Sequence, residues 1–560
     1  MKFVLRSTYA LGTQRGMGKE QHKTSTAKFL EVNLVELFSI VERTKDYALN
    51  DEERSKLKAA MSTLAIVLEE LKNKKVSITK LQQMLFGVST EKTSQVLGQE
   101  KNSATTATKK SEKPKQPGHG RRGAAAYTGA DKVVVAHPSL HAGESCPECA
   151  RGKVYPLSEP ATLVRITGMA PLGATVWECE RWRCNLCGEV YTAKAPEGVG
   201  SKKYDETATG MVGLLKYGCG LPFNRIEKLQ EGMGIPLPAA TQWELALEGG
   251  NLLEPAFEEL VRQAAQGEIL HNDDTTAKIL NLSAEQREAA SADSATEDRT
   301  GVFTTGIISI CDSKPIALFF TGVKHAGENL ADVLSQRAKE LTAPIQMCDA
   351  LAVNTAGDFE SVLGHCNCHA RRNFVEVIDN FPDECRYVLE TFRNVYKHDA
   401  EAKTQKLSAQ QRLAFHQTHS GPLMDSFQKW MQQQFDDHSV EPNSGLGKAI
   451  GYMQKHWDKL TLFLQQAGAP LDNNICERAL KKAILHRKNS LFYKTINGAR
   501  IGDIFMSLIH TAELRAINPF DYLVALLRRH DDLVDNPADW MPWNYQQTMA
   551  KLDAQALTAC

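Results

Sequence analysis

Three acidic residues stand where secondary structure would bring them together. Asp273 lies in the β-type run GEILHNDDTTAKIL, Asp349 ends the short run APIQMCD, and Glu477 begins a helical stretch. Convergence of three carboxylates is costly unless divalent cations neutralise them. Two Mg²⁺ (or Mn²⁺) ions held in this way could clamp the attacking and the leaving oxygen of a phosphodiester exchange.

The first acid has a one-residue ambiguity, because Asp274 follows Asp273 directly. Adjacent strand residues point to opposite faces, so only one of the two can reach the metal ions. Taken alone, each acid is weak evidence, since an Asp at a strand end is usually a cap or turn residue.

Two CxxC pairs predict a second, different metal site. Cys146 and Cys149 form the first pair, Cys184 and Cys187 form the second, and 34 residues separate the pairs. Two such knuckles complete the tetrahedral four-sulfur shell of a structural Zn²⁺ with no open position. Two redox pairs, or disulfides, are the alternatives.

Basic and polar residues surround the second and third acids. Cys366 and His369 share a face if the segment is helical, and could contact DNA or order the active site; a packing histidine is the alternative. Residues 478–500 contain no acid. We predict that the DNA-binding residues are His369, Arg371, Arg372, Arg478, Lys481, Lys482, Arg487 and Lys488. For the basic residues among them, a solvated charged face is the alternative. Asn473 and Asn474 could cap the helix that carries Glu477.

The elements that must position these residues form an α/β pattern. TGVFTTGIISI and KPIALFFTG flank a Cys-Asp-Ser turn and predict a hairpin, and GENLADVLSQRAKEL predicts an amphipathic helix. With the two acidic runs this gives three strands, a helix and a fourth strand. In a ribonuclease H-like fold the first and fourth strands are neighbours, which is the arrangement that the acids require.

The remaining segments predict helices and a linker. Leu57, Met61, Leu64, Leu68 and Leu71 form one helical stripe, as does the shorter run Leu30, Leu34, Leu37 and Val41, so a coiled coil or a helix packed on its own domain is expected. Residues 221–260 predict two helices, as a DNA-binding helix-turn-helix or a plain hairpin.

The pattern divides the chain into consecutive regions. We expect a helical region with heptads at 1–100, a basic linker at 101–130, a four-cysteine zinc module at 131–200, a helical segment at 201–266, a ribonuclease H-like core at 267–375 and 461–512 that is interrupted by an α-helical insertion at 376–460, and a helical tail at 513–560.

Composition is compatible with several domains and excludes few functions. The chain has 560 residues, 42% of them hydrophobic and 24% charged, and a net charge of −1. A balanced charge does not argue against nucleic acid, because binding needs local basic patches. No apolar stretch approaches a membrane span or a signal-peptide core, which predicts a cytoplasmic protein.

Four blocks of this sequence resemble the IS66 transposase family. They are HNDDTTAKIL, CDALAVNT, CNCHARRNF and LDNNICERALKKAILHRKNSLF, in that order, and QQMLFGVSTEK and KPKQPGHGRR are also similar to family segments. The resemblance spans most of residues 60–530 and implies that Asp273, Asp349 and Glu477 are the metal ligands. Asp274 stands where the family usually has Glu, and Cys368 where it usually has Ala.

The resemblance implies a DDE transposase that cuts and joins DNA at the terminal inverted repeats of a mobile element. Pairing of two ends implies a homodimer or higher oligomer, with target DNA and helper proteins of the same element as further partners. A ribonuclease H-like nuclease without joining activity is the first alternative. A non-catalytic, zinc-dependent DNA-binding protein is the second.

Overall fold

The computed structural model describes residues 2–5, 30–33, 139, 141–145, 147–149, 151–155, 171–183, 190–194, 196, 202–282, 301–357 and 359–559. The chain divides into two compact units, Met1–Gln99 and Glu100–Cys560. In the first unit, β1 (Lys2–Leu5) and β2 (Leu30–Asn33) form an antiparallel pair. The helix predicted from Leu30 is therefore wrong for Leu30–Asn33, whose backbone pairs with β1. The heptads at 57–71 and the basic linker lie outside the described residues.

The second unit is mixed α/β and is built on a five-stranded sheet. Its strands are β5 (Ile269–Thr276), β7 (Phe303–Cys311), β8 (Lys314–Gly322), β9 (Ile345–Cys348) and β10 (Val362–His365). The order is β10-β9-β5-β7-β8. The first three strands of this sheet, β5, β7 and β8, pair antiparallel, whereas β9 runs parallel to β5 and β10 runs parallel to β9. The first and fourth strands are therefore neighbours, as the acidic runs require.

The hairpin predicted around Cys311 is confirmed. β7 and β8 are joined by Asp312 and Ser313, whose φ angles of 49° and 61° are both left-handed. A two-residue turn of this conformation matches the twist of the flanking strands, so it fixes the register of the hairpin.

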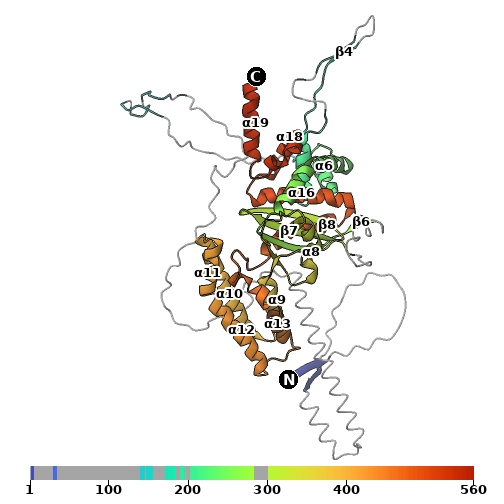
Figure 1. Cartoon of the computed structure of the whole chain (residues 1–560). Coiled ribbons are helices and arrows are strands. Elements are labelled where there is room, and N and C mark those ends of the chain that lie inside the picture. Colours follow the sequence, from blue (N-terminus) through green and yellow to red (C-terminus); the bar gives the residue numbers. More distant parts are fainter. Residues whose placement is uncertain are drawn as a thin grey trace, which may run out of the picture. The chain divides into compact units, whose positions relative to one another are not determined.

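Helices cover both faces of the sheet. α6 (Ala239–Ala264) and α8 (Ala326–Leu334) pack on one face, where the Ser309 hydroxyl donates to the Ala264 carbonyl oxygen and Asn329 donates to the Thr305 hydroxyl. α15 (Asn474–Ser490) packs on the other face, where it meets β7 at Gly306. α16 (Ile496–Leu514) lies along the edge strand β8 and packs against α6 (Figure 1). Buried Leu253 and Leu260 place the apolar side of α6 in the main core. α8 ends earlier than the stretch to Leu341 predicted, because turns begin at Ser335.

α16 also completes the hydrogen bonding of the edge strand β8. The backbone N–H groups of Ala317, Phe319 and Thr321 donate to side chains of Thr511, Ser507 and Asp503, at 3.0, 2.9 and 2.7 Å. Four residues of a helix and two residues of a strand both advance about 6 Å, so side chains every fourth residue of α16 stay level with every second N–H group of β8. This edge is thereby closed to pairing with another chain.

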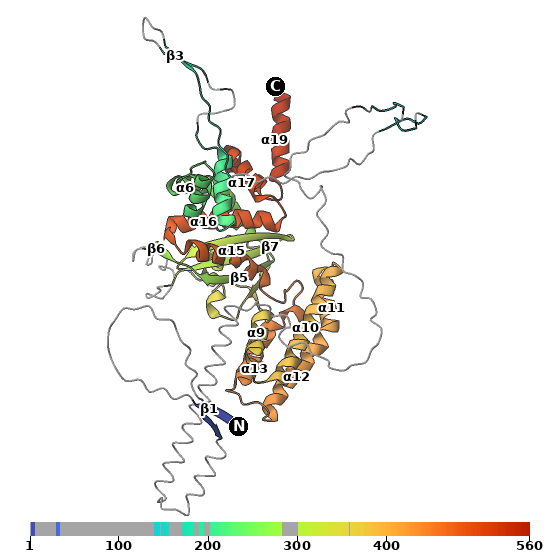
Figure 2. The same ribbon diagram turned by 180° about the vertical axis from the view of Figure 1, so that it is seen from behind.

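Helices without strands occupy the chain between β10 and the last core helices. They are α9 (Asn367–Val377), α10 (Pro382–Thr404), α11 (Ala409–His419), α12 (Gly421–Asp436), α13 (Gly445–Lys455) and α14 (Trp457–Leu460), with the short η5 (Leu462–Leu464). α9 to α13 lie side by side (Figure 2) around their own core, in which Phe374, Phe392 and Phe427 are buried.

The other elements are short or flank the core. They are β3 (Arg181–Arg183), β4 (Val190–Thr192), α4 (Glu206–Gly213), η3 (Leu214–Gly218), α5 (Phe223–Gly232), β6 (Ile279–Asn281), η4 (Ala352–Asn354), α15 (Asn474–Ser490), β11 (Tyr493–Thr495), α17 (Pro519–Arg528), α18 (His530–Asp535), η6 (Pro537–Trp540) and α19 (Tyr545–Ala559). The helix pair predicted in 221–260 is present as α5 and α6. No helix within the described residues is long and apolar enough to cross a membrane.

Candidate active site

Asp273 and Asp349 lie on neighbouring parallel strands. The ladder between β5 and β9 runs from Ile269 with Ile345 to His271 with Met347. The same register continued by two residues places Asp273 opposite Asp349, just beyond the end of β9. In-register residues of paired strands point to the same face, so both carboxylates project from one side of the sheet.

Glu477 reaches the same place from α15. This helix crosses β7 at Gly306, the residue that pairs with Asp273, and the Cys476 thiol donates to the Gly306 carbonyl oxygen at 3.2 Å. A Cβ at Gly306 would lie 3.0 Å from Leu480 Cδ2, so glycine is what permits this close approach. Glu477 follows Cys476 in the first turn of the helix.

The other two acids act on the electrostatics of Asp273. Burial raises the pKa of Asp273 to about 7, and the negative charges of Asp349 and Glu477 contribute to this rise. Glu477 Oε1 is buried and has no hydrogen-bond partner in the described part of the chain. Clustered carboxylates with unused oxygens and uncompensated charge are the donor set that a hard divalent cation needs.

Asp274 points to the opposite face of the sheet. Its backbone pairs with Thr305, whose hydroxyl accepts a hydrogen bond from Asn329 in α8. The Asp274 carboxylate lies 2.9 Å from Nδ1 of His325, the N-cap residue of α8. The adjacent aspartates therefore differ in side-chain direction: Asp273 faces Asp349 and Glu477, and Asp274 faces His325.

Asp349 is fixed by the loop that follows it. Its Oδ1 accepts from the Asn354 side chain at 2.6 Å and from the Leu351 backbone at 3.0 Å. The Asn354 carbonyl oxygen accepts in turn from Asn272 and Gln346, both buried. Asp349 is therefore oriented by a network anchored on β5 and β9.

Asn473 links α15 to β5 rather than capping its own helix. It occupies the N-cap position but makes no side-chain cap. Its side chain instead lies 3.2 Å from His271 Nδ1 and donates to the Asn272 carbonyl oxygen at 3.0 Å. Asn474 is the first helical residue and donates to Asp472. The capping role predicted for both asparagines is wrong, because bonds to a distant strand and to the preceding aspartate take their side chains.

Cys366 and His369 lie beside Glu477. Cys366 is the N-cap residue of α9, and its sulfur accepts from the Asn473 backbone at 3.2 Å. His369 Nδ1 lies 3.7 Å from Glu477 Oε1, and the ligand atoms of all three residues lie within 4.8 Å of one another. This placement favours ordering of Glu477, one of the two roles predicted for the pair.

The predicted DNA-binding residues separate into three groups. Arg478, Lys481 and Lys488 are exposed on α15, and no ion pair of theirs occurs in the described part of the chain. Lys482 pairs with Glu513 at 2.7 Å, and Arg487 binds the end of β5 through the Thr275 hydroxyl at 3.1 Å. The other predicted contacts lie on α9, where Arg371 is buried and Arg372 has partners.

Comparison with known proteins identifies the family. The model of the IS66 family of transposases matches residues 203–501, which include all three acids. The chain belongs to the IS66 transposase family. It is 26% identical over 453 residues to the uncharacterized protein y4hP of Sinorhizobium fredii, covering 75% of this chain and 76% of that protein. It is 31% identical over 188 residues to y4jD of the same organism, covering 33% of this chain and 36% of y4jD.

Sequence reasoning missed three residues of this IS66 family site. They are His271, Asn354 and His325, which hold Asn473, Asp349 and Asp274 respectively. His271 and Asn354 stood in the blocks that resemble the family. Nothing local in the sequence marks His325, which meets Asp274 only when the sheet forms.

The segment of this IS66 family member that was predicted to bind zinc is described only in part. Cys149 is exposed, while Cys146, Cys184 and Cys187 lie outside the described residues. Each CxxC pair lies between two segments that pair antiparallel. Ser145 pairs with Lys153 on either side of the first CxxC, and β3 pairs with β4 on either side of the second.

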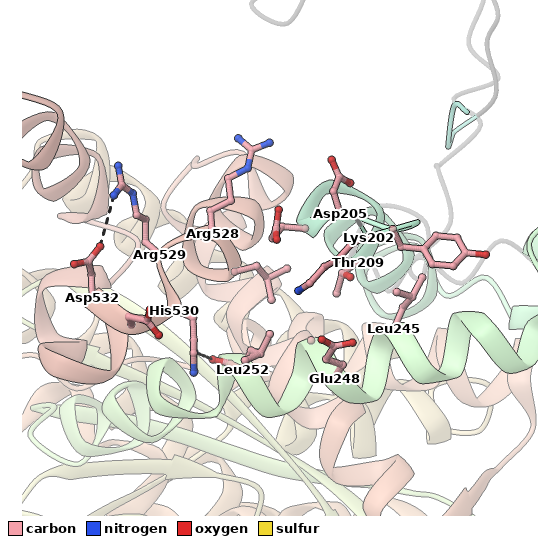
Figure 3. A pocket seen from close by; sticks show the side chains of 15 residues that line it. Lys202, Asp205, Thr209, Leu245, Glu248, Leu252, Arg528, Arg529, His530 and Asp532 are labelled. Atoms are coloured by element: carbon pink, nitrogen blue, oxygen red, sulfur yellow. Dashed lines mark hydrogen bonds and ion pairs between the residues drawn. The ribbon is translucent and has the colours of Figure 1, made fainter. Parts of the chain in front are cut away.

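A separate hollow of about 480 Å³ lies between α4, α6 and α17 (Figure 3). Its lining mixes acids and bases, and Arg529 pairs with Asp532 at 3.8 Å. His530 is bonded to the Leu252 carbonyl oxygen at 3.0 Å. None of the three clustered acids lines this hollow, so it has no part in the candidate site.

Proposed function

We propose that this IS66 family transposase is a DDE enzyme that cleaves DNA at the terminal inverted repeats of a mobile element and joins the ends to target DNA. The single observation that carries the proposal is the convergence of Asp273, Asp349 and Glu477 from two neighbouring strands and a crossing helix. The family match supports the reaction class.

We propose a ribonuclease H-like core interrupted by an α-helical insertion. The sheet order supports this core, with three antiparallel strands followed by two that are parallel to the first. The helices between β10 and α15 have their own hydrophobic core, as expected of an insertion. The paired segments around both CxxC motifs support a structural zinc module.

The three carboxylates would hold two Mg²⁺ or Mn²⁺ ions, which would supply Lewis-acid activation of the phosphodiester and of the attacking water or 3′-hydroxyl. The protein's own contribution is position. Asn354 orients Asp349, Cys476 sets α15 on Gly306, and His369 lies against Glu477. Arg478 and Lys481 extend from α15 within a turn of Glu477, where they would contact the DNA backbone.

A strand-transfer assay tests the proposal. The substrate is a labelled duplex of the element's own end with a free 3′-hydroxyl, mixed with a supercoiled target in Mg²⁺. The expected products are nicked or linearised target molecules that carry the label. Asp349→Asn should bind the end duplex but give no product.

The alternatives give other results in the same assay. A nuclease of the same fold would shorten the labelled duplex without joining it to the target. If the protein is a non-catalytic DNA-binding protein, the wild type and the Asp349→Asn variant would bind the end duplex equally well. Neither protein would then cut the duplex or the target. If labelled product forms only in complexes that contain two end duplexes, this would support the proposed dimer or higher oligomer.

A further inference from the structure

The C-terminal end of α15 carries an exposed apolar tip made of Leu491 and Phe492. Their side chains are 64% and 41% exposed. They directly follow a helix that begins at the acidic cluster, and they belong to an acid-free segment, residues 478–500. Large apolar side chains in water are unfavourable, so a pair at the end of a basic helix suggests a surface that is covered in the working complex.

The backbone at the tip is strained. Leu491 has φ 69° and ψ −40°, and the Phe492 N–H donates to the Ser490 carbonyl oxygen at 2.9 Å. This is a γ-turn with positive φ, a rare and strained conformation. Glycine commonly follows a helix at such a position, whereas a bulky leucine there is an outlier. Strain of this kind persists only where surrounding contacts impose it, and it clusters at functional sites.

Three neighbouring residues of α15 make hydrogen bonds that hold the tip in place. Arg487 bonds the end of β5, Asn489 donates to the Gly220 carbonyl oxygen at 3.1 Å, and Lys216 donates to the Ser490 hydroxyl at 2.7 Å. The tip is therefore a fixed projection rather than a frayed helix end. Since Arg487 holds β5, the strand of Asp273, the tip also keeps a set position relative to the acidic cluster.

The outer side of α15 leads from the acids to the tip. Arg478, Lys481, Leu485 and Lys488 are spaced by three, four and three residues, which places them on one side of the helix. Their charge suits a phosphate backbone. From Glu477 to Leu491 the helix rises about 20 Å, or roughly six base pairs of duplex DNA at 3.4 Å each.

We propose that Leu491 and Phe492 form a wedge that enters the stacked bases of the element's end, roughly six base pairs from the bond that is cut. Apolar side chains that enter between base steps unstack and kink duplex DNA, and basic neighbours hold its backbone. The inference rests on the proposed function, because it names how the same site grips its DNA.

The test uses the full-length protein and end duplexes with 2-aminopurine at single positions about three to ten base pairs from the cleavage site, a window around the spacing that the helix rise gives. The fluorescence of this base rises when it unstacks. With wild-type protein we expect a rise at one or two neighbouring positions. In Phe492→Ala and Leu491→Gly the rise should be lost and the cleavage rate should fall roughly tenfold or more. Leu491→Gly also relieves the strain at positive φ, so this variant should fold at least as stably as the wild type.

Leu341→Ala is the matched control, because Leu341 is also exposed and lies away from α15. It should behave as the wild type. The inference is overturned if the wild type cuts the duplexes without a fluorescence change, or if the tip variants retain the change; the proposed function then stands. It is also overturned if the tip variants alter the oligomeric state without DNA, since the tip would then contact a second copy. If the wild type neither cuts nor joins the ends, both the proposed function and the wedge are contradicted.

Discussion

Asp273, within β5, and Asp349, just beyond the end of β9, occupy in-register positions of two neighbouring parallel strands, while Asp274 points to the other face of the sheet and contacts His325. The two adjacent aspartates therefore differ in role. We expect Asp273→Asn to lower the cleavage rate by more than about 100-fold, beyond the usual effect of residues that only support metal ligands. Asp274→Asn should lower it by less than about tenfold. Equal effects of the two substitutions on the rate would contradict the assignment by face.

The hydrogen bond from Asn354 to Asp349 predicts an effect on metal affinity. Without its 2.6 Å partner, Asp349 keeps only the Leu351 N–H as a donor and is less restrained in its orientation towards the other acids. In Asn354→Ala the Mg²⁺ concentration for half-maximal cleavage should rise about 10- to 100-fold, with activity recovered at saturating Mg²⁺. Leu351→Ala is the control, because that side chain is exposed and only its backbone binds Asp349. An unchanged Mg²⁺ requirement in Asn354→Ala would argue against the orienting role.

The crossing of α15 over β7 predicts sensitivity at Gly306. A methyl group there would lie 3.0 Å from Leu480 Cδ2 and 3.1 Å from its Cγ, so Leu480 must give by a few tenths of an ångström. Leu480 is buried on α15, so we expect the helix to shift with it and to carry Glu477. We expect Gly306→Ala to fold and bind DNA but to cleave about tenfold more slowly. Gly322→Ala on β8 is the control, since its methyl group would meet nothing within 4 Å. Wild-type cleavage by Gly306→Ala would show that the position of α15 is not critical.

Much of this site could be predicted from the sequence because its determinants are local. The β-type run around Asp273, the turn at Asp312 and the acid that follows β9 are each recognisable within a short segment. Family blocks then selected the acids from many others. The errors concern contacts between distant segments. Asn473 resembles a helix cap until His271 and Asn272 take its side chain, and Leu30–Asn33 shows a helical pattern until Lys2–Leu5 pairs with it.

The stability of the helices between β10 and α15 should depend on pH through Asp399. Burial would raise the pKa of Asp399, but bonds with His416, Lys403 and Arg412 outweigh burial and hold the pKa below its usual value of 3.8. A lowered pKa in the folded state means that the stabilisation is complete above the unfolded-state pKa and is lost as pH falls below about 4.

Asp399→Asn should reduce the free energy of unfolding at pH 7 by about 1.5–3 kcal/mol, and should weaken the loss of stability between about pH 4 and pH 2. Urea unfolding followed by tryptophan fluorescence measures both quantities. Asp425→Asn, an exposed carboxylate on α12, should match the wild type throughout. If the free energy of unfolding of Asp399→Asn changes with pH in parallel with that of the wild type, this carboxylate is not the titrating group.

Binding of Mn²⁺ to the full-length protein, followed by the loss of the free-ion electron paramagnetic resonance signal, tests the shared cation site most directly. The account predicts saturable binding by the wild type. Asp273→Asn, Asp349→Asn and Glu477→Gln should each weaken it by at least about tenfold, whereas Asp274→Asn should not. Wild-type affinity in all three of the first variants would show that these carboxylates do not grip a common ion.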